Sequence, residues 1–360
     1  MKKYLIIVAC ALAIVGCKQK QGQTTGDVAE TDSVQTEETA DGKMFTPAEI
    51  SSRWANKNIH VADGGEQPDI MALLKAFHTV WPTEPANLLL GMAADKVTRQ
   101  LNPDTGGGME IDYKNGYATV QPGDTDEDRL FATVWKRSNG HRLFGIWLYT
   151  PSADNRSKPE GQVLCFYDYD PKTFMLSPET DNAIAKFQPS KDCYVQYKFP
   201  DMGRDMLVGE TDKDYNTKWH VFAYDGMNFK EETAYTDDEL CKAVVGLWKS
   251  TDKKLPLIFR VTLDEENWPQ ITDCGIYGVE DWEVVASAYE GYFYVIEQNP
   301  KGYSDDDEEQ SEFKPSLTCA FLLTKDGRLT GGYHMMLPNG KEHNGIMTME
   351  KQSGLSDYAE

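Results

Sequence analysis

Short segments rich in aromatic and β-branched residues recur along most of this chain and are separated by turn signals. Such segments favour β-strands, because branched and aromatic side chains pack well on a pleated surface. Asn-Gly and Asp-Gly pairs favour the tight turns that join antiparallel strands. They occur here at residues 115–116, 139–140, 225–226, 326–327 and 339–340. The pattern therefore predicts a mainly β protein whose strands form antiparallel meanders.

Helices precede strands in the first predicted domain, residues 45–235. Thr46 can cap a helix, Pro47 suits the first helical position and Glu49 completes a capping box. A second helix is predicted from Asp69, where apolar residues recur at helical spacing. An antiparallel meander is then predicted, with strands at residues 130–137, 143–150, 163–169, 193–199 and 219–224. We therefore expect an α+β domain.

A capped helix also begins the second predicted domain, residues 236–352. Thr236 and Glu239 can form its capping box, and the helix is expected to stop at Gly246. Apolar and polar residues alternate through 257–263, as in a half-buried strand. Further strands are predicted at residues 283–298, 316–324, 329–337 and 345–351. This succession favours a small closed β-barrel, which leaves no exposed sheet edge.

Two motifs in this domain resemble a known family. Gly246-Leu247-Trp248, between the short helix and the first strand, is similar to the Gly-X-Trp signature of lipocalins and related calycins. Residues 326–333 resemble the late hairpin of lipocalin-like domains in Bacteroidota lipoproteins. The resemblance implies a lipocalin-like barrel in which Gly246 lets the chain turn and Trp248 plugs the closed end. Lipocalins place an Arg from the last strand over this Trp, whereas the last strand here offers Lys351.

The first seventeen residues resemble the lipobox signal of bacterial lipoproteins. A positively charged start is followed by a mostly apolar run, Tyr4–Val15, which is shorter than the ~20 residues of a spanning helix. The run ends in small residues before Cys17. The resemblance implies that residues 1–16 are a signal peptide and that Cys17 carries the lipid. Several acyl chains give durable membrane anchoring, which a single chain does not.

The segment after the lipidation site is predicted to be a flexible tether. Residues 17–44 contain no aromatic residue and are rich in Gln, Thr, Asp and Glu, so they cannot form a hydrophobic core. Lys18, at the position where Asp is typical of inner-membrane retention, favours the outer membrane. We expect the protein to face the periplasm rather than the cell surface. Residues 353–360 are predicted to be a C-terminal tail.

Composition and motifs exclude several kinds of chemistry. With 36 basic and 58 acidic residues, the formal net charge of −22 does not suit a nucleic-acid binder. The six histidines form no zinc-ligand motif, and neither a serine-hydrolase elbow nor a Walker loop occurs, so no metal, cofactor or catalytic residue is predicted. The acidic run 305–309 is expected to be a solvated loop. Pairing remains open for five cysteines: Cys165, Cys193, Cys241, Cys274 and Cys319.

The predicted function is non-catalytic binding of a small apolar or glycan ligand, or of a protein partner, at the cell envelope. Calycin barrels enclose cavities, so the barrel interior is the expected site. The candidate lining or ligand-contacting residues are Trp248, Phe259, Val261, Tyr292 and Tyr294. Two alternatives stay open: a hydrolase with a site between the two domains, and a pocketless structural or inhibitory surface protein. A deep apolar cavity in the barrel would favour ligand binding, a filled barrel would favour the pocketless interaction protein, and convergent carboxylates or a Cys–His contact in a cleft would favour catalysis.

Overall fold

The computed structural model describes residues 43–102, 106–123, 126–153, 158–200, 203–253, 255–276, 282–300, 316–336 and 340–352. Several sequence predictions lie outside these residues: the signal peptide, Cys17, nearly all of the tether, the acidic run 305–309 and the tail. Among the residues that are described, no helix is long and apolar enough to cross a membrane.

The first domain begins with helices, as the capping signals predicted. Helix α1 (Pro47–Ser51) has the complete Thr46–Glu49 capping box. Hydrogen bonds from Lys43 and from the Thr46 backbone lower the pKa of Glu49 to about 2. Asp69 caps the helix α2 (Ile70–Val80) through the amide of Ala72, at 2.8 Å. The short helix η1 (Trp54–Asn56) and the helix α3 (Glu84–Ala94) complete the set.

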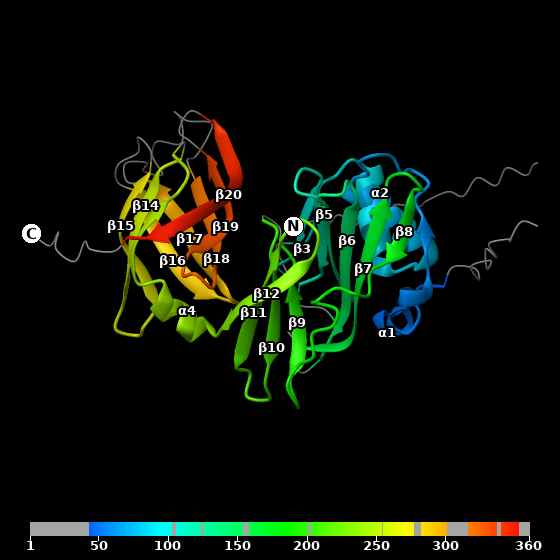
Figure 1. Ribbon diagram of the computed structural model, residues 1–360, viewed down its shortest axis with the longest axis horizontal. Coiled ribbons are helices and arrows are strands. Elements are labelled where there is room, and N and C mark those ends of the chain that lie inside the picture. Colours follow the sequence, from blue (N-terminus) through cyan, green and yellow to red (C-terminus); the bar gives the residue numbers. More distant parts are fainter. Residues whose placement is uncertain are drawn as a thin grey trace, which may run out of the picture. The chain divides into compact units, whose positions relative to one another are not determined.

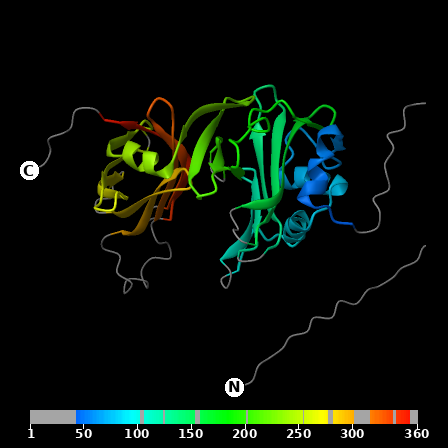
Figure 2. The ribbon, with the colours of Figure 1, turned by 90° about the horizontal axis from the view of Figure 1, so that it is seen from below.

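An eight-stranded antiparallel sheet follows, in the order β1-β8-β7-β6-β5-β4-β3-β2. One of its faces packs against the helices, which form a layer beside it in Figures 1 and 2. Phe77 of α2, for example, contacts the rings of Phe144 and Tyr167. The strands are β1 (Ile59–His60), β2 (Arg99–Asn102), β3 (Gly107–Asp112), β4 (Tyr117–Gln121), β5 (Arg129–Lys136), β6 (Arg142–Pro151), β7 (Pro159–Asp170) and β8 (Met175–Pro178).

A second antiparallel sheet covers the other face of the first. Its order is β12-β11-β10-β9, and the strands are β9 (Tyr194–Lys198), β10 (Met206–Thr211), β11 (Thr217–Tyr224) and β12 (Phe229–Tyr235). Trp135 of the first sheet packs against Phe229 of the second, with ring centres 5.1 Å apart. The sequence predicted one meander here, and the structure divides it into two. The physical reason is that β6 is apolar on both faces, so each face needs its own covering layer.

The remaining strands form the predicted barrel, which is nearly closed. The first strand pairs with both its neighbour and the last strand, in the order β15-β14-β13-β20-β19-β18-β17-β16. The segment expected as one strand at 283–298 is a hairpin that turns at Glu290 and Gly291. The elements are α4 (Asp237–Ala243), β13 (Gly246–Ser250), β14 (Leu257–Leu263), β15 (Pro269–Ile276), β16 (Trp282–Tyr289), β17 (Tyr292–Pro300), β18 (Ser316–Leu323), β19 (Leu329–Met336) and β20 (Glu342–Lys351).

The barrel interior is filled with side chains. The ring of Phe259 lies 6.1 Å from that of Phe293 and 6.3 Å from that of Phe321, centre to centre, and all three are fully buried. Met347 and Met349 of β20 belong to the same cluster. The described strands of the barrel therefore enclose a packed hydrophobic core.

Candidate functional site

Three of the five candidate binding residues lie in this packed core. Trp248, Phe259 and Val261 are buried and belong to one hydrophobic cluster. The indole N–H of Trp248 donates a hydrogen bond to the carbonyl oxygen of Val244, at 2.6 Å. Such satisfied, close-packed side chains stabilise the barrel. Packing in the barrel core therefore explains why these three residues are buried, and no ligand is needed to explain it.

Lys351 lies over Trp248, in the place where the resemblance expects an Arg. Its ammonium nitrogen is 5.6 Å from the ring centre and donates a hydrogen bond to the carbonyl oxygen of Ala243, at 3.1 Å. Gly246 lies beside it with a φ of +133°, a backbone conformation that favours glycine, and a Cβ there would displace the end of the Lys351 side chain, whose Cε would be 2.6 Å away. The lysine thus makes the cation–π contact at this end of the barrel.

The other two candidates face outward. Along β17, Phe293 and Val295 point into the barrel, so Tyr292 and Tyr294 alternate onto its outer face and are half-buried. Their rings lie 5.8 Å apart, centre to centre. Neither tyrosine lines the barrel interior. That they contact a ligand on the outer face of the barrel stays a prediction.

Aromatic side chains of the first sheet also serve the core. Trp147 and Tyr149 stack at 4.2 Å between ring centres, yet both are buried between the two sheets. Tyr167 and Tyr169 are buried on the helix-covered face. These rings offer no open platform for a sugar.

A cleft of about 520 Å³ opens at one end of the eight-stranded sheet. It forms where the β5–β6 turn, the β7–β8 turn and the segment before α2 meet. Its lining residues are mostly basic or polar: Glu66, Gln67, Lys136, Arg137, Gly140, His141, Arg142, Pro171 and Lys172. Pockets that bind small organic ligands commonly have this size.

The hydroxyl of Tyr169 holds the rim segment in place. It donates a hydrogen bond to the carbonyl oxygen of Gly65, at 2.8 Å, and accepts one from the Gly65 amide, at 3.0 Å. Gly64 allows this close approach, since a Cβ there would lie 2.7 Å from the tyrosine hydroxyl. Glu66 and Gln67 are thereby carried to the cleft on a segment fixed to the sheet.

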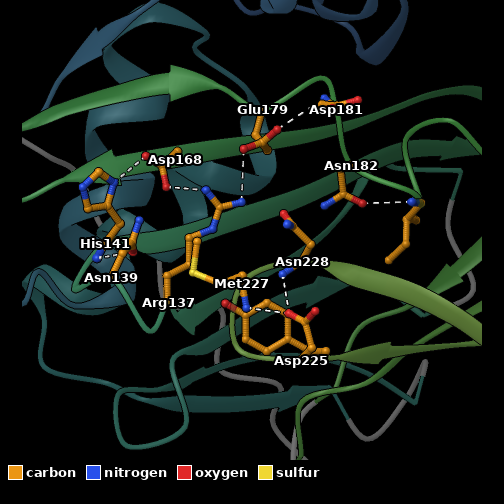
Figure 3. Close-up of polar contacts among 12 residues, drawn as sticks. Arg137, Asn139, His141, Asp168, Glu179, Asp181, Asn182, Asp225, Met227 and Asn228 are labelled. Carbon is orange, nitrogen blue, oxygen red and sulfur yellow. Dashed lines mark hydrogen bonds and ion pairs between the residues drawn. The ribbon is translucent and has the colours of Figure 1, made fainter.

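One wall of the cleft is built on an ion-pair network, shown in Figure 3. Arg137 donates to Asp168 at 2.6 Å and to Glu179 at 3.1 Å, and its side chain is almost fully buried. Asp168 also contacts Nδ1 of His141, at 2.6 Å. The other ring nitrogen of His141 is 3.8 Å from Asp170. Charge-assisted bonds of this kind fix the guanidinium and the imidazole in one orientation.

Two other basic residues of the cleft lack such partners. Lys136 and Arg142 are directly opposite each other in the β5–β6 pairing. In the described part of the chain, neither side chain forms a hydrogen bond or an ion pair. Arg142 is nevertheless only 8 % exposed, and its burial lowers the pKa of the guanidinium. None of its guanidinium nitrogens is among the buried atoms without a partner, so the charged group reaches solvent in the cleft while the rest of the side chain is covered.

The chemistry of the cleft favours binding over covalent catalysis. The His141–Asp168 pair resembles the base and orienting carboxylate of hydrolases. However, none of the nine lining residues carries a hydroxyl or thiol that this base could activate. What the cleft does offer is a set of hydrogen-bond donors with positive charge.

Sequence reasoning missed this cleft. Its residues come from segments 66–67, 136–142 and 171–172, and no motif spans them. The only available signal was the cluster Lys136-Arg137 and His141-Arg142 flanking the Asn139-Gly140 turn, in a strongly acidic chain.

Neither a disulfide nor a metal-ligand cluster marks another site among the described residues. The five cysteines of the described residues form no disulfide with one another. Within those same residues, no group of three or more His, Cys, Asp or Glu side chains is placed to hold a metal ion. Compared with known proteins, the chain matches no family model and has no significant match among curated sequences.

Proposed function

We propose that this protein is a lipid-anchored binding protein of a bacterial cell envelope, which holds its ligand without catalysis in the cleft at the end of the eight-stranded sheet. The outer membrane, with the domains facing the periplasm, is the proposed location. The observation that carries the binding site is the contrast between a packed barrel and an open, donor-rich cleft.

The anchor is proposed from the lipobox-like segment ending at Cys17. A lipocalin-like origin of the barrel is proposed from the Gly246-Leu247-Trp248 motif, and it is supported by two features. The first and last strands pair, and Lys351 covers the tryptophan. In this proposal the barrel has kept the architecture and filled the cavity, so that ligand binding falls to the first domain.

Loss of the lipidated cysteine tests the anchor. In a bacterium that processes lipoproteins, Cys17→Ala should move the protein from the membrane fraction to the soluble fraction, because the acyl chains supply the membrane affinity. The native protein and a Cys10→Ala variant, altered in the leader, serve as controls and should stay with the membrane. Retention of Cys17→Ala in the membrane fraction would contradict the anchor.

Recovery of the ligand tests the absence of catalysis. A ligand at 100 times its dissociation constant should stabilise the native state by about 2.7 kcal/mol, seen as a higher Tm for the purified lipoprotein in detergent. Mass spectrometry should then recover the ligand unchanged. Lys172→Glu in the cleft should weaken the shift, whereas Lys213→Glu, in the exposed β10–β11 turn, should not. Conversion of the ligand would instead support the hydrolase alternative.

A further inference from the structure

The strand register places two like charges face to face in the cleft. Lys136 and Arg142 are opposite residues of β5 and β6, and the side chains of such a pair start about 4.5–5.5 Å apart. Like charges in this position repel each other and destabilise the sheet. An anion bound between the two charges would remove this repulsion.

The neighbouring carboxylates do not supply that anion. Arg142 shares its parity with Phe144, so it lies on the helix-covered face of the sheet. Asp168 is opposite Leu143, which belongs to the cluster on the other face. There it is occupied by Arg137 and His141. The ion-pair network therefore leaves the Lys136–Arg142 pair uncompensated.

The remaining charges of the lining also favour an anion. Outside the ion-pair network, Lys136, Arg142 and Lys172 contribute three positive charges and Glu66 contributes one negative charge, an excess of two. The network of Arg137 with Asp168 and Glu179 has a net charge of −1, so an excess of one positive charge remains over both groups. A phosphate monoester carries a charge of about −1.5 to −2 at neutral pH. Guanidinium and ammonium groups are the usual donors to phosphate oxygens.

We propose that Lys136 and Arg142 hold the phosphate group of a small organic ligand in this cleft. The inference rests on the proposed binding function and names its ligand class. The cleft, at about 520 Å³, is much larger than a phosphate ion alone requires, so the rest of the ligand lies along Gln67 and the two turns. This local site is basic although the whole chain is acidic.

Titration calorimetry on the full lipoprotein in detergent tests the proposal, at constant ionic strength. The probes are glucose 6-phosphate, inorganic phosphate, glucose and acetate. We expect the two phosphates to bind and glucose and acetate not to bind. The tighter of the two phosphates tells whether the natural ligand is a phosphate ester or the free ion. Binding of glucose as tight as that of glucose 6-phosphate would overturn the proposal.

Arg142→Met should weaken phosphate binding at least about tenfold, as expected for loss of a charged hydrogen bond. Without phosphate this variant should melt no lower than the native protein, because it removes the repulsion between Arg142 and the like charge of Lys136 opposite it. Lys136→Met, at an exposed position, provides a second variant that does not depend on core packing. Arg53→Met, an exposed arginine outside the cleft, should bind normally.

The result separates the two proposals. Equal phosphate affinity of Arg142→Met, Lys136→Met and the native protein would overturn the phosphate site. Binding of a neutral ligand that depends on Lys172 but not on Arg142 would also overturn the phosphate site. That result would leave the proposed binding function of the cleft intact.

Discussion

Replacing Phe259 by alanine is expected to lower the free energy of unfolding by about 3–5 kcal/mol. The phenylalanine is 1 % exposed and lies at the centre of the barrel, between Phe293 and Phe321. Its removal takes away buried apolar area and leaves a cavity that the surrounding strands cannot fill by collapsing. Urea denaturation followed by tryptophan fluorescence measures the change.

Ile258→Ala is the matched control, on the same strand. Ile258 is 38 % exposed and points out of the barrel. The Ile258→Ala change should therefore lower the free energy of unfolding by less than about 1 kcal/mol. A loss at Phe259 no larger than that at Ile258 would mean that the barrel interior is not packed, and the case for binding outside the barrel would weaken with it.

Arg137→Met is expected to destabilise the first domain by about 3 kcal/mol. The guanidinium is the shared partner of Asp168 and Glu179, whose side chains are each 22 % exposed. Removing one member of a largely buried charge cluster leaves the others desolvated without compensation, and such changes typically cost about 3–5 kcal/mol. We expect a cost at the lower end of this range, because both carboxylates still reach some water.

Lys136→Met, one residue earlier, is the control for Arg137→Met. It removes one positive charge from the same turn, but Lys136 is exposed and has no carboxylate partner in the described structure. Its free energy of unfolding should not fall, because the change also removes the repulsion from Arg142 on the opposite strand. Equal losses in the two variants would contradict a structural role for the network, and with it the fixed orientation of His141 in the cleft.

Local signals in the sequence predicted the elements well because their causes are local. The Thr46–Glu49 and Thr236–Glu239 capping boxes involve atoms three residues apart, and both form as expected. Tight turns at Asn139-Gly140 and Asp326-Gly327 likewise need only neighbouring residues. The barrel followed from strand spacing, since an antiparallel succession of this length avoids free edges by closing.

The candidate site was not predictable in the same way. The alternation of apolar and polar residues through 257–263 indicated one buried face, but not whether the enclosed space was empty. That depends on how Phe259, Phe293 and Phe321 meet across the barrel, from three separate strands. The cleft has the same origin, because its three lining segments are far apart in the chain.

The sequence by itself determined the mainly β character, the helices at the start of each domain and the antiparallel barrel, because periodicity, caps and turns act over a few residues. Only the tertiary structure decided that the barrel is filled, that the first domain has two sheets, and that Arg142 is buried without a carboxylate. Those properties depend on which side chains of distant strands meet. Volume and charge compensation arise only once the strands are packed together.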